Sequence, residues 1–175
     1  RVSVYTNNDD GWQTAKDLTD KGVKVVAVID SRSIEPVMSI DGAEIFMGTD
    51  VTDTKGRRAI KSITLSNGKT INTDTLAVSG GWNPNLHLTC HHRGIPKWNN
   101  ELATFLPDSS VPVGMSVAGR AKGTMVLADA IVEGHNEGAS VAADLGFKAG
   151  DSKPATTASV AYNVVAKWGV PSGKN

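Results

Sequence analysis

The stretch RVSVYTNNDDGWQTAKDLTDKGVKVVAVID, residues 1–30, decides the fold. Residues 1–6 have the composition of a short apolar strand, and residues 12–22 place their apolar side chains on one side of a helix. Residues 23–30 form a nearly continuous apolar run, which is typical of a strand buried on both faces. This order predicts two parallel strands joined by a right-handed helical crossover.

The turn between the first strand and the helix occupies the place of the glycine-rich turn in dinucleotide-binding units. In such units the turn reads G-x-G-x-x-G, and an acidic residue closes the second strand. Aligned in this way, the three glycine positions fall on Thr6, Asn8 and Gly11, and Asp30 takes the place of the ribose-binding acid. Only Gly11 is retained, which predicts that its role is close packing of the helix on the strand.

Two interpretations of this turn remain open. In the first it is structural, because the Asn8 side chain fills the space of a diphosphate, and the carboxylates of Asp9 and Asp10 cap the helix and repel phosphate. In the second the chain is a self-standing NAD-binding module. Its cofactor-binding residues would then be Thr6, Asn7, Asn8, Gly11 and Asp30.

Composition excludes several classes of protein. The 175 residues carry 18 Lys and Arg against 18 Asp and Glu, so the net charge of zero argues against a nucleic-acid partner. No apolar run is long enough to cross a membrane. The single cysteine, Cys90, cannot form an internal disulfide and fits a reducing compartment. Because the chain opens on a core strand without Met, we expect a piece of a longer polypeptide.

The rest of the chain predicts an antiparallel meander and then a change of character. Residues 51–81 alternate like a strand meander, and Asn67-Gly68 is a strong hairpin signal. Further on, residues 114–118 read as a short strand and residues 124–146 as a long helix. The fold class expected is α/β, with a Rossmann-like β-α-β unit, a meander and a returning strand–helix segment.

This pattern predicts three parts. Residues 1–84 form a degenerate NAD(P)-binding-like domain, such as the small domain of flavoproteins with two dinucleotide domains. Residues 85–147 form the C-terminal part of a larger FAD/NAD-binding-like domain, and residues 148–175 are a linker. Apolar surface should be exposed along the long helix and near Trp98.

Several motifs point to one family. DTLAVSGGWNPNLHLTCHHRG at 74–94 and GMSVAGRAKGTMVLADAIVEGHNEGASVAADLG at 114–146 resemble the alpha subunit of bacterial heterotetrameric sarcosine oxidase. The phrases VYTNNDDGWQTAKDL and VTDTKGRR are similar to the same family. The resemblance covers residues 1–147, and GGWNPN is its most specific motif.

The resemblance implies a cytoplasmic flavoprotein complex that oxidatively demethylates sarcosine. Such an enzyme makes glycine, hydrogen peroxide and a one-carbon unit captured by tetrahydrofolate. Amine oxidation belongs to the flavin-bearing beta subunit, while the alpha subunit carries NAD and a folate site in an aminomethyltransferase-like half. The partners implied are the other subunits and the rest of the alpha chain, and this chain alone should have no catalytic residues and no activity.

One departure from the wider reductase pattern bears on the cofactor. The motif A-G-D is replaced here by Ala118-Gly119-Arg120, so a cation stands in place of the acid. Arg120 is either a phosphate ligand, since Arg offers a planar set of donors, or a solvated side chain before a helix. If NAD binds this part, the predicted residues are Gly119, Arg120 and Thr124. A remaining alternative is the equivalent domain of a flavin-dependent opine or proline dehydrogenase.

A cluster of potential metal ligands precedes the long helix. His87, Cys90, His91 and His92 are dense in sequence. Adjacent residues converge poorly on one ion, and no second Cys-x-x-Cys exists. No metal site is therefore predicted, and these side chains are expected at a surface or interface.

Overall fold

A computed structural model describes the chain except at residues 92, 109–110, 149, 151, 168 and 170–175. The chain divides into two compact units. Unit 1 comprises residues 1–81 together with the segment that begins at Asn163, and unit 2 comprises Trp82–Tyr162. Each unit is described by itself below.

Unit 1 is built on a parallel sheet of four strands in the order β3-β2-β1-β7. The strands are β1 (Val2–Thr6), β2 (Val25–Asp30), β3 (Glu44–Phe46) and β7 (Thr75–Ser79). Helix α1 (Asp9–Asp20) connects β1 to β2, as the sequence predicts. The chain runs from β1 outward to β2 and β3 and later returns to β7 on the other side of β1, so the order reverses between β1 and β7.

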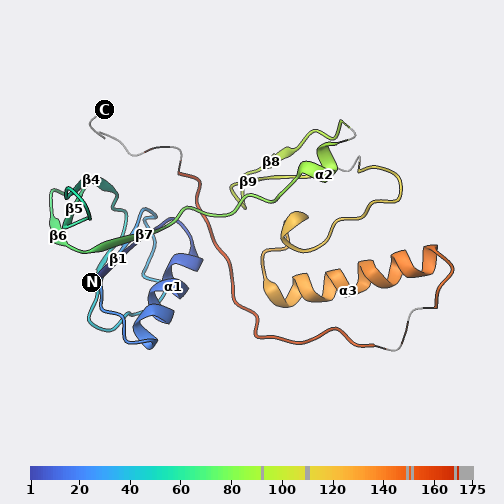
Figure 1. The fold of residues 1–175 in the computed structure, drawn as a ribbon, viewed down its shortest axis with the longest axis horizontal. Coiled ribbons are helices and arrows are strands. Elements are labelled where there is room, and N and C mark those ends of the chain that lie inside the picture. The colour runs from blue at the N-terminus through green and yellow to red at the C-terminus, as the bar shows by residue number, and fades with distance from the viewer. Residues whose placement is uncertain (92, 109–110, 149, 151, 168, 170–175) are drawn as a thin grey trace. The chain divides into compact units, whose positions relative to one another are not determined.

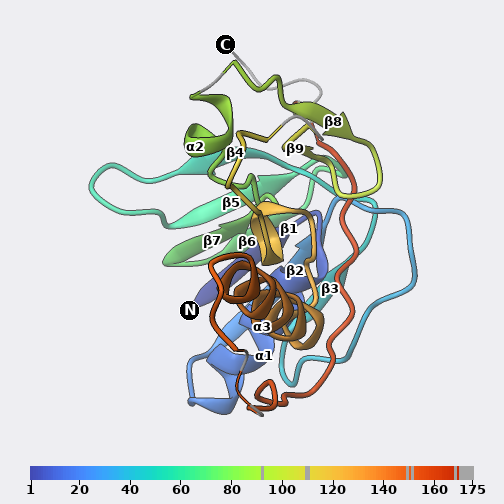
Figure 2. The same ribbon diagram turned by 90° about the vertical axis from the view of Figure 1, so that its right-hand side faces the viewer.

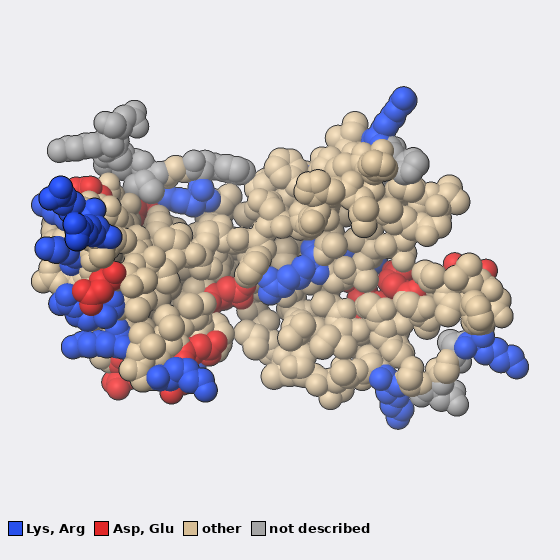
Figure 3. Space-filling model, in the orientation of Figure 1, with Lys and Arg blue, Asp and Glu red and all other residues tan. Residues whose placement is uncertain are grey.

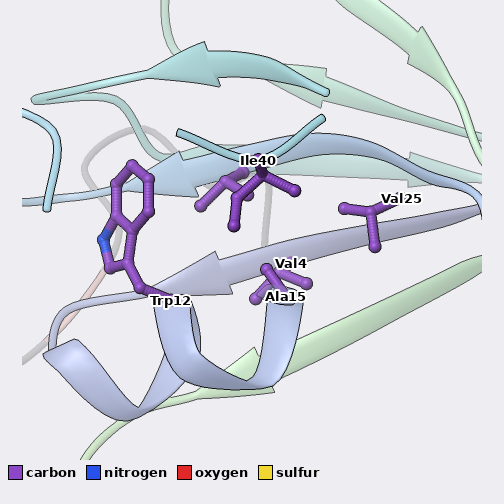
Figure 4. Packing of buried hydrophobic residues seen from close by; sticks show 6 residues of the cluster. Val4, Trp12, Ala15, Val25 and Ile40 are labelled. Carbon is purple, nitrogen blue, oxygen red and sulfur yellow. The ribbon is translucent and has the colours of Figure 1, made fainter. Parts of the chain in front are cut away.

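Helix α1 covers one face of this sheet (Figures 1 and 2). Trp12 and Ala15 on the helix are fully buried against Val4, Val25 and neighbouring apolar side chains, including Ile40 (Figure 4). Burying apolar side chains of this size contributes roughly 1.5–3 kcal/mol each. The amphipathic helix predicted for residues 12–22 is therefore confirmed, although it begins three residues earlier.

The opposite face of the sheet is covered by an antiparallel meander of β4 (Val51–Lys55), β5 (Ser62–Leu65) and β6 (Thr70–Asn72). Its buried residues Ile63, Leu65 and Ile71 pack against Ala27 and Ile29 of β2. β2 is thus buried on both faces. The turn between β5 and β6 contains the predicted Asn67-Gly68 pair, with Gly68 at a positive φ of 84°.

Exposed Lys and Arg side chains gather on the hairpin between β4 and β5 and beside it (Figure 3). The segment Lys55-Gly56-Arg57-Arg58 lies in this hairpin, where β4 pairs with β5 antiparallel. A solvated turn is therefore sufficient to explain its charge.

Unit 2 has little regular structure apart from one long helix. Its elements are α2 (His87–Cys90), β8 (Lys97–Asn99), β9 (Thr104–Leu106), the 3₁₀ turn η1 (Gly119–Ala121) and α3 (Leu127–Asp144). β8 and β9 form a two-stranded antiparallel sheet in which the rings of Trp98 and Phe105 meet edge to face at 5.1 Å. Neither α2 nor this small sheet is predicted by the sequence.

The strand predicted over residues 114–118 is wrong. These residues have no sheet partner, and Ala118 is extended with φ −133° and ψ 163°. A strand needs a neighbour for its backbone hydrogen bonds, and none of the described strands of unit 2 lies beside this segment. The helix predicted over residues 124–146 is confirmed as α3.

Apolar surface remains exposed in unit 2, as predicted. Along α3 and just beyond it the exposed side chains are Leu127, Val132, Val141, Leu145 and Phe147. Near Trp98, Ile95 and Phe105 are also exposed. Within the described part of the chain, no helix combines the length and apolar character required to cross a bilayer.

Candidate functional site

The turn after β1 brings together the residues predicted from the glycine-rich motif. The Thr6 hydroxyl donates to the Asn8 carbonyl over 2.8 Å and accepts from the Asn8 amide over 3.1 Å, closing the turn without a glycine. A Cβ added to Gly11 would overlap the Thr6 side chain. Gly11 is therefore required for close approach of α1 to β1, as predicted.

Asn8 caps α1, whereas the sequence pointed to Asp9 and Asp10 as the caps. Asn8 is extended, with φ −152° and ψ 170°, and its Oδ1 accepts from the Gly11 amide over 3.3 Å. Its Nδ2 donates to the Ser79 carbonyl over 2.9 Å. Because Asp9 and Asp10 are the first two residues of the helix, they lie too late to cap it, and their charges face the positive end of the helix dipole.

Asp30 lies at the end of β2, but its carboxylate is buried and already hydrogen-bonded. It is fully buried, and its Oδ2 accepts from Trp12 Nε1 over 2.7 Å and from Arg32 Nη2 over 2.8 Å. Its Oδ1 accepts from the Arg32 backbone amide over 2.9 Å. These donors saturate the carboxylate, so ribose hydroxyls would have to displace a buried indole or guanidinium.

Arg32 joins Asp30 to Asp9 in one buried network. Its Nη1 donates to Asp9 Oδ1 over 2.8 Å, and its side chain is only 2% exposed. Burial lowers the pKa of the Arg32 guanidinium, but hydrogen bonds to Asp30 and Asp9 more than offset this and raise it above its ordinary value. The guanidinium of Arg32 is thus a buried cation held between two carboxylates.

The segment Asn163–Lys167, which we call the strap, lies along the start of α1. The Asp9 amide donates to the Asn163 carbonyl over 3.1 Å, and Arg32 Nη1 donates to the same oxygen over 3.0 Å. Asp9 Oδ2 accepts from the Asn163 amide over 2.8 Å and from Asn163 Nδ2 over 2.7 Å. A peptide residue of the chain itself thus binds the helix end at which a diphosphate lies in dinucleotide-binding units.

The strap is held at two further points. The Val165 amide donates to the Asn7 carbonyl over 3.0 Å, and Asn7 Nδ2 donates back to the Val165 carbonyl over 2.7 Å. Lys167 Nζ lies 2.8 Å from Asp50 Oδ2. The strap therefore spans the carboxyl end of the sheet from α1 toward β4.

A small cavity remains beside the strap, at the carboxyl ends of β1 and β7. It measures about 230 Å³, and its lining includes Thr6, Asn7, Ser79 and Lys167. Ligands of open α/β sheets bind at such a reversal of strand order. Pockets for drug-sized ligands usually start at roughly 300 Å³, so the strap leaves room only for something smaller than a dinucleotide.

Two of the three predicted residues of unit 2, Gly119 and Thr124, come together around Glu133 of α3. The Gly119 amide donates to Glu133 Oε2 over 2.7 Å, and Lys122 Nζ lies 3.0 Å from Glu133 Oε1. The Thr124 hydroxyl, followed by Lys122 and the Gly119 amide, lowers the pKa of the Glu133 carboxyl although partial burial raises it. These donors suit an anion, and the anion they hold here is a carboxylate of the chain.

The Arg120 side chain lies against two aromatic rings. Its guanidinium lies 5.3 Å from the centre of the Trp82 ring and 5.7 Å from that of Tyr162. Arg frequently contacts aromatic faces in this way. Arg120 is thus not simply solvated, and its role as a phosphate ligand, the other alternative left by the sequence, stays a prediction.

The His and Cys residues do not form a metal centre within the described residues. His87 and Cys90 lie on α2 and His91 follows it, while His92 lies outside the described residues. Across the part of the chain that the structure describes, no group of three His, Cys, Asp or Glu side chains is arranged to hold an ion.

Sequence reasoning missed Asn163 and Glu133, the residues that fill the two predicted sites. Asn163 follows a stretch that reads as a linker, and no local pattern ties it to Asp9. Glu133 is one of several acids on α3 and resembles an ordinary solvated residue. Only tertiary structure reveals either contact.

Comparison with known proteins identifies the relatives of this chain. No established family model matches the sequence. The sarcosine oxidase alpha subunit of Rhizobium meliloti (strain 1021) is 38% identical over 148 residues, covering 83% of this chain and 15% of that protein. The protein of the same name from Corynebacterium sp. (strain P-1) is 28% identical over 187 aligned positions, covering 98% of this chain and 19% of that protein. The chain spans less than a fifth of the length of these relatives.

A solved structure supports the fold. L-proline dehydrogenase from P. horikoshii matches 86% of this chain and 27% of its own with a TM-score of 0.63. At 18% identity this likeness concerns the fold alone, and it confirms the predicted α/β class. The sequence matches lead to one conclusion: the chain is a homologue of one part of the sarcosine oxidase alpha subunit, the family that its motifs predict.

Proposed function

We propose that the chain serves as a non-catalytic part of the alpha subunit in a sarcosine-oxidising complex. The observation that carries the proposal is 38% identity to the Rhizobium meliloti alpha subunit over 83% of this chain. The parent complex would oxidatively demethylate sarcosine to glycine and hydrogen peroxide and pass the one-carbon unit to tetrahydrofolate. Its partners are the other subunits and the rest of the alpha chain, in a cytoplasmic heterotetramer.

In this proposal unit 1 is a scaffold and does not hold NAD. The residues of its turn do not fit the cofactor, because Asp30 is saturated by Trp12 and Arg32 and the strap lies where the diphosphate would bind. Flavins and folate belong to parts of the complex beyond this chain. Of the predicted residues, Gly119 and Thr124 are the better candidates for an NAD phosphate, provided that Glu133 gives way.

A self-standing NAD-binding module is the weaker alternative for the same reason. An amino-acid dehydrogenase is also weaker, since the match to L-proline dehydrogenase lies in the fold, whereas the sequence matches are to sarcosine oxidase alpha subunits.

A chimera tests the parent reaction. The matching 148 residues of the Rhizobium meliloti alpha subunit are replaced by those of this chain, and the chimera is expressed with its partner subunits. We expect assembly on size-exclusion chromatography and sarcosine-dependent peroxide formation, with none from this chain alone. An assembled chimera that lacks activity would contradict the proposal.

Isothermal titration with NAD and with ADP-ribose tests the scaffold role of unit 1. We expect no binding to the chain. Micromolar NAD binding that persists in Thr124→Val and disappears in Asp30→Ala would instead establish unit 1 as the NAD-binding module.

A further inference from the structure

We propose that Asn7, Asp9 and Arg32 of unit 1, together called the groove below, form a peptide-binding site specific for asparagine in an extended segment, and that the strap is its occupant. In this view, the degenerate turn binds a peptide segment in place of a dinucleotide. The inference rests on the scaffold role proposed for unit 1 in one respect, the exclusion of NAD.

The groove requires a ligand that both donates and accepts hydrogen bonds. Asp9 Oδ2 accepts from the Asn163 amide and side-chain Nδ2, while the Asp9 amide and Arg32 Nη1 donate to the Asn163 carbonyl. One asparagine residue thus satisfies every one of these groups. The diphosphate of a dinucleotide offers only acceptors at neutral pH, and it would place its charge beside the Asp9 carboxylate.

Asparagine is selected over its closest analogues by the same contacts. An aspartate at residue 163 would place a second carboxylate against Asp9 Oδ2, where a hydrogen bond of 2.7 Å now joins the two side chains. An alanine would lose that bond and leave the buried Asp9 carboxylate with one donor fewer. The backbone contacts alone do not distinguish these residues.

The rest of the strap adds affinity with little further selection. Val165 contributes through its backbone to Asn7, while its side chain is 55% exposed. An antiparallel bridge between Asn8 and Val164 shows that the strap pairs with the turn as a short strand would. Main-chain bonds that give affinity, with a few side chains that give specificity, are typical of strand addition. Lys167 supplies a second side-chain contact through its ion pair with Asp50.

A peptide competition experiment on the whole chain tests the proposal. The double variant Asn163→Ala, Lys167→Ala loosens the strap without altering the groove, and circular dichroism verifies its fold. It is titrated with the capped peptide VAYNVVAK, residues 160–167, and with the same peptide carrying Asn163→Asp. Parallel titrations use NAD and ADP-ribose.

We expect the native peptide to bind the loosened chain at least roughly tenfold more tightly than the Asn163→Asp peptide, as loss of a charged hydrogen bond implies. Equal affinity of the two peptides, or no binding of either, would overturn the asparagine specificity while leaving the exclusion of NAD intact. Binding of NAD or ADP-ribose without the peptide would overturn both, because the strap would then cover a working dinucleotide site.

Discussion

Trp12 donates its indole N–H to the carboxylate of Asp30 over 2.7 Å, and both side chains are fully buried. Trp12 follows Gly11, the last glycine position of the turn, so the helix that would present a diphosphate instead delivers a large donor to the ribose-binding acid. Arg32 also donates a hydrogen bond to the Asp30 carboxylate. The acid is thus retained at its predicted position but has become part of the core.

Trp12→Phe should therefore destabilise unit 1 strongly. Phenylalanine fills most of the space of the indole ring, but the Asp30 carboxylate loses a buried hydrogen-bond donor. The loss of a hydrogen bond to a charged group costs roughly 1.5–3 kcal/mol of stability. Urea unfolding followed by circular dichroism measures the change. Trp82→Phe is the matched control, since Trp82 is 55% exposed and its ring remains available to Arg120; equal losses from the two variants would refute the importance of the bond.

Gly11→Ala should also destabilise the fold, by roughly 1–3 kcal/mol, because the added methyl overlaps Thr6 of β1. Gly138→Ala on α3 is the control. Nothing lies within 4 Å of a Cβ at that position, so removing a helical glycine should stabilise the helix by roughly 0.5–1 kcal/mol. Thermal unfolding of the two variants should shift in opposite directions, and a shift in the same direction would contradict the packing argument.

The contact between Glu133 and the Gly119 turn should depend on acid pH. Because the folded pKa of Glu133 lies below its ordinary value of 4.5, the contact contributes stability above that value and loses it as the pH falls through the folded pKa. NMR titration of the Glu133 carboxyl carbon measures the midpoint. Thr124→Val should raise the midpoint toward 4.5, whereas Thr124→Ser should leave it lowered; no change in Thr124→Val would contradict the assignment.

Arg120→Ala should loosen the backbone at both ends of unit 2. The guanidinium lies over Trp82 and Tyr162, the first and last residues of the unit, and each such contact contributes roughly 0.5–1 kcal/mol at exposed sites. Hydrogen exchange of the backbone next to both aromatic residues should accelerate. Arg57→Ala, on an exposed hairpin, should leave these rates unchanged.

The sequence predicted those elements whose signal is local. The apolar run ending at Asp30, the amphipathic helix after Asn8 and the Asn67-Gly68 hairpin each carry their own signal, and all three form. Residues 114–118 have the composition of a strand, yet they form none, because strand formation depends on a neighbour that composition does not reveal.

The sequence grouped the residues of the first candidate site but did not predict their contacts. Thr6 to Gly11 and Asp30 do meet at one end of the sheet, because parallel strands end at the same edge. Their hydrogen-bond partners come from Asn163, far along the chain, and from the side chains of Trp12 and Arg32. Periodicity and motif spacing report neighbours within a few turns or strands, so they could not reveal that these groups are already engaged.

The contact between Asp9 and Asn163 joins residues 154 positions apart. Unit 2 is consequently an insertion in the sequence of unit 1. During synthesis, the residues around Asp9 leave the ribosome well before the strap that binds them. At roughly 5–20 residues per second, that interval lasts roughly 8–30 seconds, during which water takes the place of Asn163 at Asp9 Oδ2. The last step in completing unit 1 therefore follows the synthesis of unit 2, and a ribosome that stalls between the two leaves the start of α1 without its strap.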